Sequence, residues 1–166
     1  MSQSWVRVRW AAIGAAVAVS LGAGGLGVVQ AARGSSERTV FVPINPCRLF
    51  DTRPEFQVGD RTMPLGPGEI HTFHGRGAVG QCDLPADATG LVLNVTAVDA
   101  TEHTFLTFWP AGIDRPNASH LNPAPGGAAT PNAVSVDLNE GGEFAVFNRA
   151  GSVHVLADVV GDYADH

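Results

Sequence analysis

The sequence has no lysine, only two cysteines and, beyond residue 39, no long stretch with a helical apolar period. Arginine is therefore its only permanently cationic residue. Residues 32–166 contain eight arginines and sixteen carboxylates, a formal charge of −8. An acidic surface repels phosphate backbones, so we do not expect nucleic acid as a partner. The missing helical period argues against helices in this part of the chain.

The first 31 residues have the pattern of an export signal. Arg7 and Arg9 precede an uncharged run over 10–32, and Val29 and Ala31 are the small residues that favour cleavage after position 31. An uncleaved membrane anchor is the alternative, because a run of about 20 apolar residues spans a bilayer. We therefore expect a signal peptide or anchor over 1–31, a polar tether over 32–38 and one domain over 39–166. The protein is expected to be secreted or at the cell surface, touching the membrane only through an uncleaved N-terminal segment.

The two cysteines, Cys47 and Cys82, both follow this signal. In an exported chain an even pair predicts a disulfide. A metal site and a nucleophilic cysteine are the alternatives, but no CxxC motif and no closely spaced histidine supports a metal. The disulfide is therefore the preferred interpretation.

Short apolar or alternating runs fill the chain from residue 39, and turns rich in Gly, Pro, Asn and Asp separate them. This pattern of short runs separated by turns predicts an all-β fold, an antiparallel β-sandwich like a jelly roll with about eight to nine short strands. The expected strands are 39–42, 47–52, 69–74, 90–98, 104–109, 119–122, 133–138, 143–148 and 152–160.

Two of these strands combine an apolar face with a second face that carries polar groups. Alternation over 90–98 places Leu91, Leu93, Val95 and Ala97 together, and alternation over 152–160 does the same for Val153, Val155, Ala157 and Val159. Asn94 and Asp158 fall on the opposite faces. We expect these two to belong to a partly buried polar site, which requires hydrogen-bond partners.

Five segments resemble, in order, a family of exported bacterial domains of actinobacterial type: "VPINPCRLFDTR", "GQCDLPADATGLVLNVTAV", "FLTFWPAGIDRPNASHLN", "NAVSVDL" and "GSVHVLADVVGDY". They match its pattern of PCRxxDTR, NVT, LTxWPxG and HVxxDVxG over roughly residues 41 to 163. The resemblance implies an extracellular β-domain, often appended to larger secreted or surface proteins, with no established activity. The chain differs at Asp162, since an aromatic residue usually follows Gly161 directly in this family.

The octapeptide "PCRLFDTR" contains a cysteine, an aspartate and two arginines within eight residues. Strict alternation puts Asp51 and Arg53 on one face with Cys47, and Arg48 on the other. Asp51 with either arginine offers the acceptors and planar donors that bind a sugar or a carboxylate. The alternative, which we prefer, is an internal ion pair that holds the strand beside the disulfide.

Other candidate sites have weaker patterns. Trp109 with Arg115 would make a sugar-stacking platform if exposed, but a core anchor in a two-sided apolar strand is preferred. Histidines 71 and 74 are spaced for opposite faces of a strand, which is poor zinc geometry. We expect no metal or other cofactor. Calcium is an alternative, with ligands from separate loops, and its candidates are Asp83, Asp87, Asp99, Glu102 and Asp114.

These observations favour a non-enzymatic binding or adhesion module for cell-wall or extracellular polysaccharide. A structural scaffold or protein-interaction domain of the cell envelope is the second hypothesis. A carboxylate-dependent hydrolase is the third, because the sequence cannot place the pair of carboxyl groups about 5–9 Å apart that such an enzyme needs. The two binding hypotheses differ in partner, polysaccharide or envelope protein, and share a location outside the cell.

Overall fold

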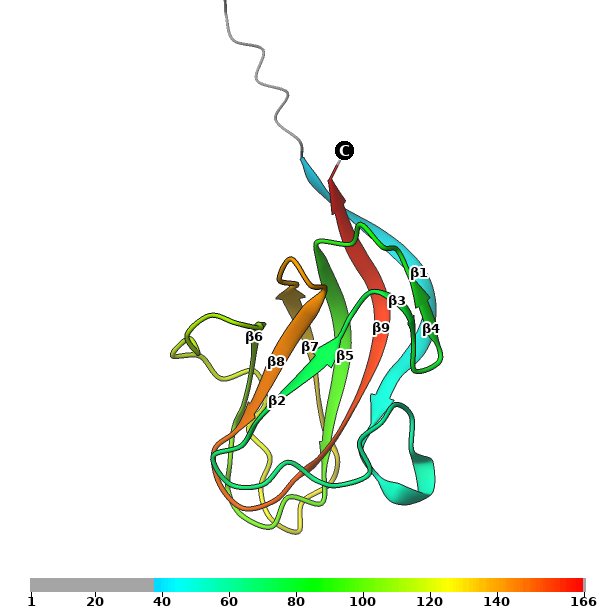
Figure 1. Ribbon diagram of the computed structural model, residues 1–166. Helices are drawn as coiled ribbons and strands as arrows, with labels where there is room; N and C mark the ends of the chain where they lie inside the picture. The colour runs from blue at the N-terminus through cyan, green and yellow to red at the C-terminus, as the bar shows by residue number, and fades with distance from the viewer. Residues whose placement is uncertain (1–37, 166) are drawn as a thin grey trace, which may run out of the picture. The chain divides into compact units, whose positions relative to one another are not determined.

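The computed structural model describes residues 38–165, and these residues form nine β-strands and one short 3₁₀ turn (Figure 1). The predicted signal peptide and all of the tether except Arg38 lie outside the described residues. The strands are β1 (Thr39–Asp51), β2 (Ile70–His74), β3 (Gly77–Val79), β4 (Cys82–Leu84), β5 (Gly90–Val98), β6 (Leu106–Pro110), β7 (Thr130–Asp137), β8 (Glu143–Asn148) and β9 (His154–Asp165), and the turn is η1 (Pro54–Phe56). The predicted all-β class is confirmed.

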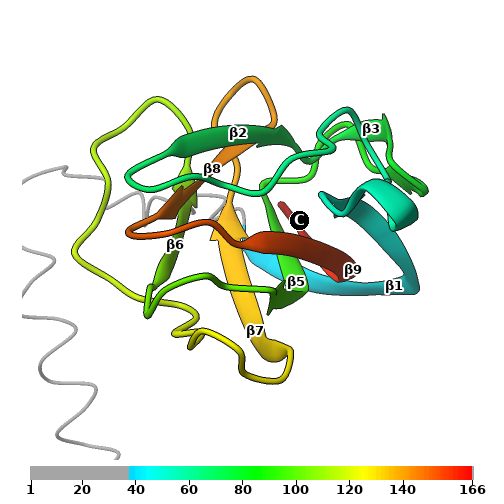
Figure 2. The same cartoon turned by 90° about the horizontal axis from the view of Figure 1, so that it is seen from below.

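The strands form two packed antiparallel sheets and a hairpin. One sheet has four strands in the order β1-β9-β5-β7, the second has three in the order β2-β8-β6, and β3 pairs with β4. Seen from below, the two sheets form two layers with the β3–β4 hairpin at one side (Figure 2). This arrangement is a β-sandwich, as predicted, whereas the finer description as a jelly roll stays a prediction.

The core lies between the layers and follows the predicted alternation. On β5 and β9, the residues assigned to the apolar faces are all no more than 1% exposed. Phe108, Phe144 and Val146 cover them from the three-stranded sheet. Because side chains alternate across a strand, the other face of each sheet is left for solvent, loops and polar groups.

Aromatic rings join the two sheets on the side where β1 and β2 meet. Phe50 of β1 stacks on Phe73 of β2 with ring centroids 3.8 Å apart, and Phe144 lies 5.9 Å from Phe73. Each such pair contributes about 0.5–1.5 kcal/mol beyond the burial of its area. The stack therefore fixes the edge strand β2 against β1, next to the groove described below.

Three segments differ from the strands expected. β1 is one strand rather than two, because Pro43 and Pro46 lie at an irregularity of an edge strand, where a missing N–H is tolerated. The short β3 and β4 were missed, being three-residue strands beside glycines. The expected strand 119–122 was wrong: its only ladder contact is the bridge of Leu121 to Leu106.

The end of β9 places Asp162 in the interior. Val92 pairs with Gly161 and Leu93 with Val159, so Val160 is an additional residue that reverses the alternation. Asp162 therefore lies opposite the buried Leu91 and is 1% exposed, and neither of its carboxylate oxygens has a hydrogen-bond partner among residues 38–165. Burial raises the pKa of Asp162, and the charge of Asp87 raises it further.

Candidate binding site

A β-bulge organises the octapeptide in a way that strict alternation does not predict. Arg48 pairs with Asp158 and Phe50 with Ala157, so Leu49 is an additional residue in β1. Leu49 and Phe50 both enter the core, and Arg48 comes to the same side of the strand as Asp51. The expectation that Arg48 and Asp51 lie on opposite faces was therefore wrong.

Arg48, Asp51, Arg53 and Asp158 form one ion-pair cluster. Arg48 donates to Asp158 through Nε at 2.5 Å and Nη2 at 3.2 Å, and to Asp51 through Nη1 at 2.8 Å. Arg53 donates to Asp51 through Nε at 3.0 Å, Nη2 at 2.7 Å and its backbone N–H at 3.1 Å. The cluster links β1, the residues that follow it and the neighbouring strand β9.

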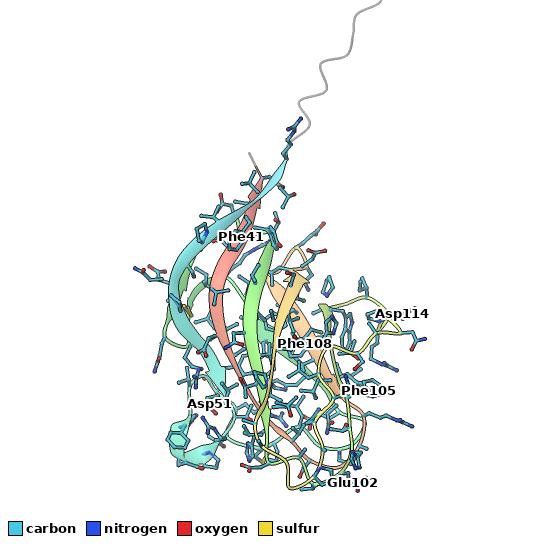
Figure 3. All side chains as sticks on the ribbon, turned by 180° about the vertical axis from the view of Figure 1, so that it is seen from behind. Phe41, Asp51, Glu102, Phe105, Phe108 and Asp114 are labelled. Atoms are coloured by element: carbon cyan, nitrogen blue, oxygen red, sulfur yellow. A yellow bond between two sulfur atoms is a disulfide. The ribbon has the colours of Figure 1, made fainter. Side chains whose placement is uncertain are left out.

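Asp51 is the buried centre of this cluster, with an exposed fraction of 0% (Figure 3). Burial alone would raise the pKa of its carboxyl. The hydrogen bonds from Arg53 and the charges of Arg53 and Arg48 outweigh that effect and hold the pKa below its ordinary value. An ionised carboxylate that already accepts four hydrogen bonds is saturated, so Asp51 is a structural anchor rather than a ligand contact or a general acid.

An open depression of about 390 Å³ lies over the outer part of the cluster. Arg48, Arg53 and Asp158 line it, with side chains 28%, 23% and 26% exposed. Phe56 of η1 is 56% exposed and lies under the Arg53 guanidinium, 4.3 Å from ring centroid to Cζ. Gln81 borders the other side. The depression thus offers to solvent the exposed part of the Phe56 ring, which Arg53 partly covers, and Arg53 Nη1, which makes no hydrogen bond among the described residues.

The other residues predicted for this site lie apart from it or take no part. Asn94 is the neighbour of Asp158 across β5 and β9, but it is exposed and its side chain makes no hydrogen bond within residues 38–165. Trp109 is 4% exposed and donates from Nε1 to the carbonyl of Ile113 at 3.0 Å. Arg115 stacks on the Phe147 ring at 4.2 Å, on the three-stranded sheet. The sequence alone did not show that these three residues take no part in the ion-pair cluster around Asp51.

A second hollow, which the sequence analysis missed, is a groove of about 470 Å³ beside β2. Phe50 and Phe73, the stacked aromatic pair, are part of its lining, and Asp60, Arg61, His71 and Arg76 supply polar groups. The signal in the sequence was "HTFH", since alternation places His71 and Phe73 on one face of a strand. Nothing in the sequence showed that the loop around Asp60 lies opposite that strand.

His71 presents a defined donor to the groove. Arg61 Nη1 lies 3.2 Å from His71 Nδ1, and because a guanidinium only donates, Nδ1 accepts and the proton is on Nε2. Burial, and then the charge of Arg61, hold the pKa of His71 below its ordinary value, so the ring is neutral at neutral pH. Arg61 itself is occupied by Glu69 at 2.8 Å and by two backbone carbonyls.

Two further polar groups of the groove remain available to a ligand. Arg76 donates from Nε to Ala88 and from Nη1 to Glu140, both backbone carbonyls, which leaves Nη2 without a partner among the described residues. Asp60 is exposed and makes no ion pair within residues 38–165. A carboxylate acceptor, an imidazole donor and a guanidinium donor therefore line a groove whose two aromatic residues, Phe50 and Phe73, are 3% and 9% exposed.

Carboxylates are sparse in both hollows. Of the described residues, Asp60 is the only acid that lines the groove, and Asp158 is the only one that lines the depression. Across residues 38–165, no three His, Cys, Asp or Glu side chains are grouped so that they would hold a metal ion. The carboxylates considered for calcium are not gathered into such a group.

The predicted disulfide is present: Cys47 of β1 is bonded to Cys82 of β4, with Cα atoms 5.3 Å apart. It ties the hairpin to the strand that carries Arg48, and Gln81 adds a backbone hydrogen bond to Arg48 at 2.9 Å. A disulfide is typical of an oxidising compartment. Among the described residues, no helix has the length and apolar character needed to cross a bilayer.

Comparisons of this chain with models of known protein families, with curated proteins and with solved structures found no match.

Proposed function

We propose that this domain is an exported, non-enzymatic module that binds cell-wall or extracellular polysaccharide. The observation that carries the proposal is the groove, which has Phe50 and Phe73 in its lining and Asp60, His71 and Arg76 as its available polar groups. Its volume of about 470 Å³ falls in the range of small-molecule sites, roughly 300–1,000 Å³.

The chemistry of the groove suits a sugar. A pyranose ring has an apolar face of C–H groups, which packs on aromatic carbon, and a rim of hydroxyls, each both donor and acceptor. His71 Nε2–H and Arg76 Nη2 are donors, and Asp60 is an acceptor. A few placed polar groups around an apolar floor provide orientation and specificity.

The scarcity of acids supports binding over hydrolysis. A glycosidase needs two carboxyl groups flanking the scissile bond. Among the described residues, the groove offers only Asp60 and the depression only Asp158, and Asp158 is held by Arg48. Asp51, which shares Arg48 with Asp158, is saturated by hydrogen bonds and has a lowered pKa, so it is unsuited to protonate a leaving group.

Export is supported by the N-terminal sequence pattern, by the disulfide and by the resemblance to exported bacterial domains. In the sandwich, the start of β1 and the end of β9 lie together at one end, whereas Asp51 and η1 lie toward the other (Figures 1 and 3).

Calorimetric titration of the full-length chain with a panel of oligosaccharides from bacterial walls and capsules tests the proposal. We expect saturable binding to at least one of them, weakened tenfold or more by Asp60→Ala and His71→Ala because each removes a hydrogen bond at a desolvated contact. Asp114→Ala, in a loop on the opposite side of the sandwich from Asp51 (Figure 3), is the control and should bind normally. Absence of binding to every oligosaccharide would contradict the proposal.

A scaffold role is the second candidate, and one observation favours it. Val40 and Phe41 are 43% and 45% exposed on the part of β1 that pairs with the end of β9. Exposed apolar side chains at a strand edge are suited to contact with another protein. Sedimentation of the chain as an oligomer that Phe41→Ser converts to monomer would favour this function.

A further inference from the structure

The groove and the depression are neighbours along three segments of the chain. Residues 47–48 of β1 line the depression and residues 49–50 line the groove. Val58 borders the depression and Gly59 the groove, while Gly80 borders the groove and Gln81 the depression. The two hollows therefore border one another along these three segments, with the residues that turn into the core at 49–50 on the groove side and Arg48 on the depression side.

Glycines occupy two positions along this border. A Cβ at Gly80 would lie 2.1 Å from the carbonyl oxygen of Leu49, so only glycine allows the hairpin to pack on β1 there. At Gly59 a Cβ would lie 3.7 Å from Phe50 Cβ, which is ordinary contact. Both have positive φ, 80° at Gly59 and 61° at Gly80, which favours glycine. Neither position places a side chain between the two hollows, and at Gly80 the backbone of the hairpin packs directly on the backbone of β1.

The fixed charges of the two hollows balance. In the depression, Arg48 and Arg53 are neutralised by Asp51 and Asp158. In the groove, Arg61 is paired with Glu69. The remaining Arg76 and Asp60 have opposite charges, and His71 is neutral at neutral pH. A polyanion would meet this neutral surface on a protein of net charge −6, which disfavours its approach.

We propose that the two hollows are subsites of one continuous site for a linear, uncharged polysaccharide, which crosses from the groove to the depression over Gly59 and Gly80. This inference rests on the proposed function. In the groove, a sugar contacts Phe73 and bonds to His71. In the depression, a later sugar of the same chain contacts the exposed Phe56 ring. Linking two weak contacts through one ligand raises affinity, because the second contact forms within the complex.

A length series tests this continuity. The full-length chain is titrated with uncharged β-1,4-linked N-acetylglucosamine and glucose oligomers, from the disaccharide to the octasaccharide, and with galacturonate oligomers of the same lengths. We expect affinity for an uncharged series to rise roughly tenfold or more once the oligomer spans both hollows. Galacturonate oligomers should bind more weakly at every length.

Two variants separate the subsites. Gly59→Asn adds a side chain to the border between the hollows, and asparagine tolerates positive φ better than most residues. Phe56→Ala removes the aromatic ring of the depression at a position that is 56% exposed, so folding should be unaffected. Phe56→Ala should keep the affinity of the wild type for short oligomers and lose its gain for long ones. Gly59→Asn, at the border of the groove, should lose that gain, while Asp114→Ala keeps both the affinity and the gain. Phe56→Ala alone suffices if Gly59→Asn fails to fold.

Each of the other outcomes rejects a specific part of this proposal. Affinity that is independent of length, or a length-dependent gain that survives in both variants, would overturn the continuous site and leave the groove as a binding site. Tighter binding of the galacturonate oligomers than of the uncharged ones would overturn the inference that the ligand is uncharged. If the complete panel of wall and capsular oligosaccharides used for the proposed function also fails to bind, the proposed function falls and this inference falls with it.

Discussion

Arg48 donates hydrogen bonds to Asp51 in its own strand and to Asp158 in the adjacent strand β9. The two carboxylates differ in environment, since the Asp51 side chain is 0% exposed and the Asp158 side chain is 26% exposed. One guanidinium therefore joins a buried ion pair to a solvent-facing one. The consequences of removing each carboxylate should differ accordingly.

Asp51→Asn should destabilise the domain by roughly 2–4 kcal/mol, because it leaves two arginines without their buried acceptor. We place the value below the upper end for buried pairs since both arginines remain partly exposed. Asp158→Asn is the matched control and should cost about 1 kcal/mol or less. Urea unfolding measures both free energies, and equal losses in the two variants would contradict the assignment of Asp51 as the anchor.

Asp51 and Asp162 should give the stability opposite dependences on pH. The folded-state pKa of Asp51 is lowered, so its contribution is present above the ordinary value of 3.8 and is lost as the pH falls through the lower folded value. In urea unfolding at pH 6 and pH 2, the difference between the wild type and Asp51→Asn should shrink at the lower pH. A difference that does not change with pH would show that the carboxylate charge is not what stabilises this cluster.

The pKa of Asp162 is raised in the folded state, so folding favours the neutral acid. The stability of the domain should therefore fall as the pH rises from 3.8 through the raised folded value. Asp162→Asn removes this ionisation, so it should raise the melting temperature at pH 7 and have little effect at pH 3. Asp114→Asn, on an exposed loop, should do neither. A lower melting temperature for Asp162→Asn at pH 7 would mean that the buried carboxylate is stabilising.

Loss of the Cys47–Cys82 bond should destabilise the chain by about 4 kcal/mol, from the entropy of closing a loop over a separation of 35 residues. The double variant Cys47→Ala, Cys82→Ala avoids a free thiol and keeps the buried position of Cys82 apolar. Its unfolding in urea should be independent of added reductant, while that of the wild type shifts to lower urea when reductant is present. Equal stabilities of wild type and double variant would contradict this.

Gly59 and Gly80 provide a matched pair, because both have positive φ but only one lacks space for a Cβ. Gly59→Ala should cost about 1 kcal/mol, from backbone strain alone. Gly80→Ala adds a clash with the Leu49 carbonyl and should cost about 2 kcal/mol more. Thermal unfolding separates the two effects. Similar melting temperatures for the two variants would show that the hairpin can move away from β1.

The sequence predicted the strands whose alternation is regular and failed where a bulge interrupts it. The strands 90–98 and 143–148 were predicted with their observed bounds, and the disulfide and the buried faces of β5 and β9 were also predicted correctly. The bulges at Leu49 and Val160 were not visible, because each depends on the register with a neighbouring strand that lies far away in the sequence: Arg48 pairs with Asp158, and Val92 pairs with Gly161. They determine which side Arg48 and Asp162 occupy.

The candidate site shows the same division between local and long-range information. Arg48, Asp51, Arg53 and Asp158 were named from the sequence, and the structure brings them together. The groove was missed because it forms where the loop around Asp60 lies opposite β2, a contact between segments with no shared pattern. Trp109 was expected to be a core anchor rather than an exposed platform, because its strand is apolar on both faces, and it is 4% exposed.

Chemical-shift mapping would show directly whether the two hollows bind the sugar, because it reports where a ligand binds as well as whether it binds. Backbone amides of the full-length chain are followed during titration with the uncharged oligosaccharide that binds best. We expect saturable changes in the amide chemical shifts of Asp60, His71 and Phe73 in the groove. For the longer oligomers we also expect them at Phe56 and Gln81 in the depression. Shifts confined to the face around Arg115 and Phe147, or no shifts at saturating ligand, would contradict it.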